Sequence, residues 1–417
     1  MRRILLCLAL SGCLFACSKN NGGKVNPGGT DTTKKPTVSP VGDVVGKVTA
    51  GYQGWFSATG DGSPLNNWGH MNLECWPDVT DYPTTYQTEF GNLQNGQPAK
   101  MFSSYDQSTV NLHFKWMQQY GIDCAALQRF SGELSNNDLK NQRDGMAQKV
   151  RAAAEASGRK FYIMYDISGH KDMQATLKED WVNTITGKLD LLSSPAYAKQ
   201  NGKPVVCIWG MGYIQQPVPG GGDPVACLDV INWFKAKGCY VIGGVPMAWR
   251  AGNNQSRGDF FSVYKAFNMI SPWAVGAEVN TTYEPWIKGD NDFCVKQGID
   301  YQPVAYPGFS FHNSNAGSRQ NEIPRMHGDF MWSQVATMKR VGARSLYMAM
   351  FDELNEGTAI FKVAPSANEI PVGRWYLTLD ADGVSTSSDF YLRLTGDAGK
   401  MIRGEIAYTD KHPTSHN

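Results

Sequence analysis

Predominantly apolar runs of strand length recur along the chain from residue 47 onward, and stretches with helical spacing of apolar residues lie between them. The eight runs are 47–55, 123–130, 160–167, 204–210, 239–246, 267–275, 302–308 and 345–353. The spacing of apolar residues predicts helices at 110–120, 139–156, 227–237 and 328–341. Apolar strands that alternate with helices are typical of a parallel sheet covered on both faces.

Eight such units predict an α/β fold, a (β/α)8 TIM barrel with long loop insertions and a short C-terminal extension. The alternative is an open doubly wound sheet. No G-x-G-x-x-G follows the first run, so the dinucleotide-binding version of that fold has no support. We place the barrel at 46–365. Residues 366–417 are too short for an independent domain and predict a last helix and loops docked on the barrel.

The first 17 residues have the pattern of an export signal. Met-Arg-Arg is followed by an apolar run at 4–16, which is too short to span a bilayer, and then by Cys17. The segment from Leu14 to Cys17 resembles a bacterial lipobox, which implies lipidation of Cys17. Residues 18–45 are polar and predict a flexible tether. We expect an exported protein that is lipid-anchored to a bacterial membrane, in the periplasm or at the surface; an ordinary secretory signal is the alternative.

Composition narrows the choice of partners. The net charge is +1 without a basic block, which gives no support for nucleic acid as a partner. The cysteines beyond Cys17 show no C-x-x-C pair, so we expect neither a zinc site nor any other metal or cofactor. We expect a monomer. Export permits disulfides, but three of these cysteines lie in apolar runs, as buried free thiols do. Those three are Cys124, Cys207 and Cys239. The full set beyond Cys17 is Cys75, Cys124, Cys207, Cys227, Cys239 and Cys294.

The eighth run ends in an unusual group of carboxylates, Asp352, Glu353 and Glu356. Carboxylates that lose hydration and repel one another are tolerated where they serve a function. If the chain turns helically after the strand, Glu353 and Glu356 share one face, with Cβ atoms roughly 5–6 Å apart. This suits two carboxyls that flank a glycosidic bond, about 5–5.5 Å apart in retaining enzymes. The alternative is an acidic pair at a solvated helix start.

In a barrel of this kind, the chemistry takes place at the carboxyl ends of the strands. Most of these ends carry Trp or Tyr, whose rings cover sugar faces and whose polar tips form hydrogen bonds. We expect the insertion at 57–99 to wall the cleft or to cover the barrel mouth. An arginine near the carboxylates would keep one of them ionised.

The predicted catalytic residues are Glu353 and Glu356. The predicted substrate-binding residues are Tyr52, Trp55, Gln128, Arg129, Tyr165, Asp166, Trp209, Trp249, Tyr306, Arg325, Asp352 and Asn355.

The segment at 351–360, F-D-E-L-N-E-G-T-A-I, resembles the strand-eight motif N-E-W-H-E-G-T-Q-I-E of glycoside hydrolase family 99, within a broader group similar to families 71 and 99. Segments 103–106, 121–123 and 325–330 resemble other parts of that family. The resemblance implies a metal-free (β/α)8 glycosidase. In it Glu353 would act as base on the sugar 2-hydroxyl, and Glu356 would protonate the leaving oxygen and then activate water, with net retention. The motif's Trp and His are Leu354 and Asn355 here, and its final Glu is Phe361.

The resulting hypothesis is an endo-acting, retaining glycoside hydrolase whose partner is an α-linked polysaccharide or glycan. Two alternatives remain open. One is a glycan-binding lipoprotein without turnover, for which Leu354 and Asn355 leave room. The other is an inverting α-glucanase, whose carboxyls would lie roughly 6.5–9.5 Å apart.

Overall fold

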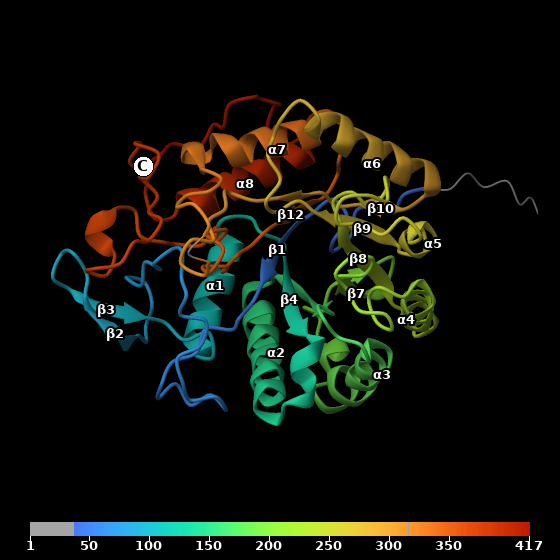
Figure 1. Cartoon of the computed structure of the whole chain (residues 1–417), viewed down its shortest axis with the longest axis horizontal. Coiled ribbons are helices and arrows are strands. Elements are labelled where there is room, and N and C mark those ends of the chain that lie inside the picture. The colour runs from blue at the N-terminus through green and yellow to red at the C-terminus, as the bar shows by residue number, and fades with distance from the viewer. Residues whose placement is uncertain (1–36, 316) are drawn as a thin grey trace, which may run out of the picture. The chain divides into compact units, whose positions relative to one another are not determined.

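The computed structural model describes residues 37–315 and 317–417. Its main sheet is a ring of parallel strands (Figure 1). The strands are β1 (Val48–Tyr52), β4 (Cys124–Phe130), β5 (Lys160–Asp166), β7 (Lys203–Trp209), β8 (Tyr240–Pro246), β9 (Met269–Trp273), β10 (Asp300–Tyr301), β11 (Val304–Ala305) and β12 (Leu346–Met348). A two-residue strand, β6 (Lys199–Gln200), pairs antiparallel with β7.

The ring closes through β10 and β11, which are two halves of one strand. β10 pairs with β9, and β11 pairs with β12. The residues between them continue both pairings, because Gln302 donates its backbone N–H to Ile270 and Pro303 accepts from Tyr347. Proline has no N–H of its own, which interrupts the regular pattern of the strand. Each predicted run contains one strand of this ring, and the (β/α)8 barrel is confirmed.

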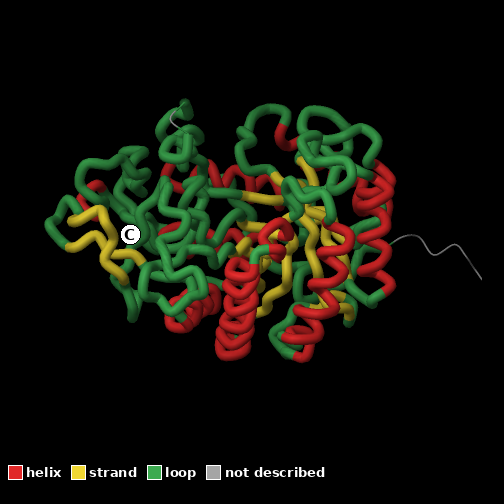
Figure 2. The backbone as a smooth tube through the Cα atoms, turned by 60° about the horizontal axis from the view of Figure 1, so that its bottom comes forward, coloured by secondary structure: helices red, strands yellow, loops and turns green. Residues whose placement is uncertain are grey.

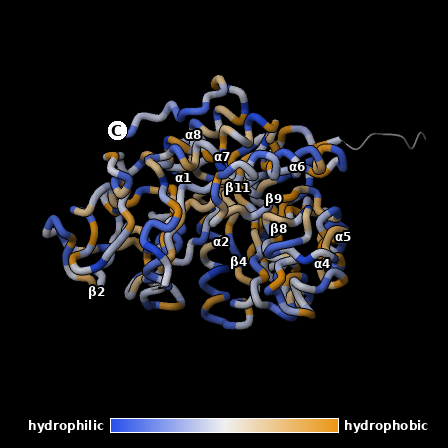
Figure 3. The backbone as a smooth tube through the Cα atoms, turned by 45° about the horizontal axis from the view of Figure 1, so that its top comes forward, coloured by the Kyte–Doolittle hydropathy of each residue, from blue (hydrophilic) through white to orange (hydrophobic). Residues whose placement is uncertain are grey.

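Helices surround the strands. Four of them match the predicted ones: α1 (Gln107–Gln119), α2 (Asn137–Ser157), α4 (Pro224–Ala236) and α7 (Asp329–Arg340). The others are α3 (Met173–Glu179) with a π-helical continuation (Asp180–Lys188), α5 (Phe261–Tyr264), α6 (Tyr283–Gln297) and α8 (Phe390–Arg403). α2 is mostly hydrophilic, drawn blue in Figure 3, and buries a narrow face with Met146, Val150 and Ala153 against the barrel. Asn136 caps it by accepting from two backbone N–H groups.

The C-terminal segment belongs to the barrel more closely than expected. α8 packs on α7 and β12 and buries Phe390, Leu394 and Met401. It follows the eighth strand and is the eighth helix of the barrel. The boundary that we expected at residue 365 therefore lies beyond residue 403, because the barrel needs this helix to cover β12.

The folded part also begins earlier than expected. The backbone N–H of Ser39 donates to Asp300 Oδ1 at 2.8 Å, and Arg344 donates to the carbonyl of Ser39 at 3.0 Å. Val44 and Val45 are buried. The predicted tether at 18–45 is therefore too long at its C-terminal end. Its residues up to 36, and the signal segment with Cys17, lie outside the described residues.

The insertion at 57–99 leads into a separate antiparallel hairpin of β2 (Tyr86–Asn92) and β3 (Pro98–Met101), set apart from the main sheet in Figure 2. The six cysteines from Cys75 to Cys294 are all free and buried. No helix within 37–315 or 317–417 has the length and apolar character needed to cross a membrane.

Candidate active site

The candidate site lies where the chain leaves β12. Beyond Met348 the chain stays hydrogen-bonded to the neighbouring strands, because Ala349 donates its N–H to Ala305 and Phe351 donates to Gly51. Residues 354–357 then form a turn, closed by Gly357 at φ 63°. The shared face of the two Glu residues was argued for a chain that turns helically after the strand. The turn instead joins Glu353 and Glu356 through a short loop at the carboxyl end of the barrel, which we call the carboxylate turn (352–359).

Glu353 is buried and held on both carboxylate oxygens. Its Oε2 accepts from Gln53 Nε2 at 2.9 Å, and its Oε1 accepts from the backbone N–H of Asn355 at 2.8 Å. Its side chain is only 3 % exposed. Burial raises the pKa of Glu353, and the negative charges of Glu356 and Asp352 raise it further, while the two donors oppose the shift.

Glu356 lies on the same turn but has a different environment. Burial raises the pKa of its carboxyl group. Among the described residues, no donor forms a hydrogen bond with this side chain. Two repelling carboxyls share a proton more readily than separated ones, and they titrate as a pair. Of the two carboxyls, the pKa of Glu353 is raised more strongly, because the negative charge of Glu356 adds to the effect of burial.

Asp352 joins the carboxylate turn to the end of β1. Its two oxygens accept from the backbone N–H groups of Gln53 at 2.8 Å and Gly54 at 2.9 Å. Complete burial raises its pKa to about 6. Gly54 has φ 60°, a conformation that favours glycine. The prediction that Asp352 contacts substrate is corrected, since its oxygens are occupied by backbone donors and it positions Gln53 instead.

Two more predicted binding residues support the backbone of the carboxylate turn. Asn355 Nδ2 donates to the carbonyls of His70 and Asn72 at 2.8 and 2.9 Å, which fastens the insertion to the turn. Arg325 is buried and donates through Nη2 to the carbonyls of Gly357 and Ala359, each at 2.9 Å. Its guanidinium lies 4.5 Å from the ring centre of Tyr391. Neither residue lies free for substrate, and Arg325 binds carbonyls rather than the carboxylates that we expected it to ionise.

Sequence reasoning missed Glu74, a buried acid in the insertion. Its Oε2 accepts from Ser310 Oγ at 2.7 Å, and its Oε1 accepts from the backbone N–H of Asn313. Its own N–H donates to the carbonyl of Leu354 at 2.8 Å. Glu74 thus joins three loops around the carboxylate turn. One acid in a long irregular segment carries no periodic signal that would have identified it.

Four predicted binding residues lie at the mouth of the barrel. Gln128 donates through Nε2 to Asp166 Oδ2 at 3.0 Å, and burial raises the pKa of Asp166. The half-buried Trp55 stacks between His70 and Phe130, with ring centres 4.0 and 5.5 Å away. Trp209, also half-buried, lines the barrel interior beside Trp273. Their contact with a substrate remains a prediction.

Five other predicted binding residues face the surrounding helices and loops, and these predictions are corrected. Side chains alternate between the two faces of a strand, so only every second residue of a strand end reaches the interior. On β4 and β5, Gln128 and Asp166 meet at the mouth, while their neighbours Arg129 and Tyr165 both bind Asp180 in the π-helical segment. Tyr52 contacts His113 of α1, and Trp249 contacts Asp290 of α6. Tyr306 packs on Phe330 of α7 and donates to the carbonyl of Ala277.

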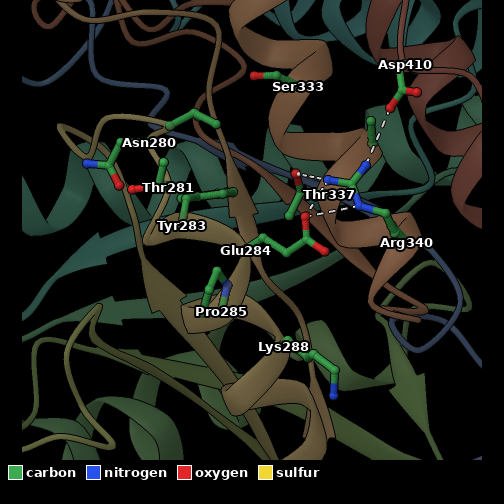
Figure 4. Close-up of a pocket in the computed structure, with 12 residues that line it drawn as sticks. Asn280, Thr281, Tyr283, Glu284, Pro285, Lys288, Ser333, Thr337, Arg340 and Asp410 are labelled. Atoms are coloured by element: carbon green, nitrogen blue, oxygen red, sulfur yellow. Dashed lines mark hydrogen bonds and ion pairs between the residues drawn. The ribbon is translucent and has the colours of Figure 1, made fainter.

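Besides a cavity of about 410 Å³ between the end of α1 and α8, two cavities are large enough for a small ligand. One of about 560 Å³ lies between α6 and α7 and is crossed by an ion pair of Arg340 with Glu284, 2.6 Å between Nη2 and Oε2 (Figure 4). None of the carboxylate-turn residues lines it. The other, of about 380 Å³, lies at the carboxyl ends of β8 and β9, on the same end of the barrel as Glu353. No group of three His, Cys, Asp or Glu side chains in 37–315 and 317–417 is placed to hold a metal ion.

Comparisons with known proteins bear on the fold. No protein-family model matches the chain, and no curated protein does. Two solved structures of the family 99 endo-alpha-mannosidase from Bacteroides thetaiotaomicron are similar, with TM-scores of 0.64, and 0.63 for the complex with bis-tris-propane. In both, the identity is 13%, and the match covers 87% of this chain and 98% of that chain. The chain shares the (β/α)8 barrel fold of these two structures. A family 39 glycoside hydrolase from Bacteroides cellulosilyticus matches at a TM-score of only 0.40, with 9% identity, over 79% of this chain and 61% of that one.

Proposed function

We propose that the protein is a glycoside hydrolase that cleaves an α-linked polysaccharide or glycan, with Glu353 and Glu356 as its two acting carboxyls. The observation that carries the proposal is the arrangement of these groups on one turn at the carboxyl end of the barrel. Glu353 is buried and Glu356 half-buried, burial raises the pKa of both, and repulsion from Glu356 adds to the raised pKa of Glu353. Such pairs divide acid and base roles in glycosidases. The similar fold of the endo-alpha-mannosidase supports this choice of reaction.

The two environments assign the roles. We assign the acid role to Glu356, because burial raises its pKa and no described donor would be lost when it carries a proton to the leaving oxygen. Glu353 receives hydrogen bonds from Gln53 and Asn355, which favour the carboxylate. Glu353 therefore acts as the base or nucleophile in the first step, and Glu356 activates water in the second. We propose retention of configuration and cleavage within the chain, as in the family that the turn resembles.

The test is a reducing-end assay on α-mannans, α-glucans and α-linked oligosaccharides with the wild type, E356Q and E353Q. Each variant should lose roughly a thousandfold or more in kcat, since each removes one acting carboxyl. E89Q is a matched control, because Glu89 is exposed on β2, and it should retain full activity. Unchanged melting temperatures would show that the folds are intact.

Three results would contradict parts of the proposal. Cleavage that survives in E356Q removes the role of Glu356. Binding of a glycan by the wild type without release of reducing ends after long incubation favours the non-catalytic alternative. Proton NMR of the first product separates retention from inversion, and an inverted product favours the α-glucanase alternative.

A further inference from the structure

The cavity at the ends of β8 and β9 has features of a sugar site. It lies between the loop after β8, the loop after β9 and the first turn of α6, and its volume is about 380 Å³. Pockets for small ligands begin at roughly 300 Å³. Among the residues that line it are Met247, Asn254, Gln255, Trp273, Glu278 and Trp286. We call it the β8–β9 cavity.

Two tryptophan rings of this cavity are held in place by the protein. Trp286 donates its indole N–H to the carbonyl of Met247 at 2.9 Å. Trp273 contacts Trp209 edge-on, with ring centres 5.6 Å apart, and lies 6.2 Å from Tyr347. Both rings are half-buried, so part of each stays accessible. Rings fixed before binding lose little conformational freedom and offer an apolar surface to the C–H face of a sugar.

The polar residues around these rings suit hydroxyl groups without a negative charge. The amide side chains of Asn254 and Gln255 are exposed and can both donate and accept hydrogen bonds. Of the described residues that line the cavity, Glu278 alone ionises, and no Lys, Arg or His lies among them. An anionic sugar would meet a carboxylate without a compensating cation, which disfavours its binding. The larger cavity of Figure 4 differs, because Lys288 and Arg340 line it.

The β8–β9 cavity and the packed barrel interior share one lining residue. Trp273 lines both this cavity and the barrel interior. Tyr347, its neighbour in the interior, places its hydroxyl 3.8 Å from the sulfur of Met350, two residues before Asp352. Both places lie at the carboxyl end of the barrel, so a glycan across the mouth would need to span the distance from the carboxylate turn to the two tryptophans.

We infer that the β8–β9 cavity binds a neutral sugar unit of the glycan, away from the bond that is cleaved. This inference rests on the proposed function for the identity of the ligand, and it adds that the substrate is an uncharged chain long enough to reach both places. Trp286 and Trp273 would hold the sugar face, and Asn254 and Gln255 its hydroxyls.

The test measures binding separately from cleavage. Affinity gel electrophoresis with soluble α-mannan, soluble α-glucan and polygalacturonate compares the wild type with W286A, W286F and N254A/Q255A. We expect retention by a neutral polymer, no retention by polygalacturonate, and roughly tenfold weaker binding for W286A, with a smaller loss for W286F, which keeps a ring. W233A is the matched control, because Trp233 is half-buried on α4 outside the cavity, and it should bind normally. N254A/Q255A alters only exposed side chains, so it tests the site even if W286A fails to fold.

Activity gives a second readout. In W286A, KM for the polymer should rise while kcat on a small aryl α-glycoside stays the same, since that compound occupies only the carboxylate turn. Loss of polymer binding in W286A and N254A/Q255A, in a protein that never cleaves any glycan, would support the site and overturn the hydrolase proposal. Cleavage with binding and KM unchanged in all the variants would overturn the site alone. Failure of the wild type to bind any neutral polymer, or binding of polygalacturonate at least as tight, would also overturn it.

Discussion

At the scale of single residues, the site depends on how Gln53 is held. The backbone N–H of Gln53 donates to Asp352, and the side-chain amide of Gln53 donates to Glu353. Both the backbone and the side chain of Gln53 are held by hydrogen bonds. Because Gln53 directly follows β1, the end of this strand sets the orientation of the Glu353 carboxylate. An ionised carboxylate gains more from such a donor than a protonated one does. Gln53 is therefore a positioning residue that also favours the charged form of Glu353.

This reasoning predicts the effect of Q53L on the pH profile. Without the amide donor, the ionised form of Glu353 loses a hydrogen bond, so its pKa rises further above the usual range of a carboxyl group. The base is then protonated at a higher pH, and the acidic limb of kcat/KM moves to higher pH. We expect kcat/KM at neutral pH to fall by roughly tenfold to a hundredfold, measured as initial rates across the pH range.

N355A is the control for Q53L. It removes the side-chain contacts with the insertion but keeps the backbone N–H that donates to Glu353 Oε1. Its acidic limb should stay at the wild-type pH even if the rate falls. A limb that moves equally in both variants would show that loop displacement, and not the Gln53 amide, controls the pKa of Glu353.

At the scale of elements, the eight strands were predictable because both faces of a barrel strand are buried, which leaves long apolar runs. The same property hides which face of each strand points inward. Arg129 and Tyr165 occupy strand ends beside Gln128 and Asp166, and only the alternation seen in the structure separates the two pairs. α6 was missed because glycine and charged residues interrupt its apolar spacing, whereas α8 corresponds to the last helix predicted within 366–417.

The carboxylate turn was predicted for its composition and not for its conformation. Its shape comes from partners distant in the sequence. Asn355 contacts the insertion, Leu354 accepts from Glu74, and Arg325 donates to Gly357 and Ala359. No local pattern around residue 353 contains that information, so from the sequence alone the conformation of the turn could be stated only as a condition.

Arg325 gives this element its sharpest test. R325M removes the donors of two buried carbonyls but keeps an apolar chain of similar length. We expect a loss of about 2–4 kcal/mol in the free energy of unfolding, because buried carbonyls without partners are costly. Urea unfolding at neutral pH measures it. R319M is the matched control, since Arg319 is exposed on the same loop, and should change stability by less than about 0.5 kcal/mol.

The activity of R325M distinguishes support of the turn from general stability. A displaced turn misplaces both carboxyls, so kcat should fall at a temperature where the variant is fully folded. A variant that is less stable but has unchanged kcat would show that Arg325 stabilises the barrel without positioning Glu353 and Glu356.

At the scale of the whole molecule, the chain enters the barrel at the end opposite the carboxylate turn. Residues 39–46 contact Asp300 at the start of β10, Gln200 beside the start of β7, and Ser345 just before β12. The strands are parallel, so these contacts lie at their amino ends, whereas Glu353 and the β8–β9 cavity lie at their carboxyl ends. A protein held by a segment before residue 39 would keep its candidate site free for a large polymer.

We propose that the holding segment is a lipid anchor on Cys17, and this predicts how the chain is processed. Expressed in a bacterial host with a labelled fatty acid, the wild type should incorporate the label and sediment with membranes, whereas C17S should do neither. C13S is the matched control. Cys13 lies inside the apolar run, so this variant should still be labelled.

If the carboxylate end of the barrel is free, anchored wild type and unanchored C17S should cleave soluble polymer with equal kcat/KM. Labelling that persists in C17S would contradict the anchor, and a polymer rate that rises only when the anchor is lost would contradict the orientation.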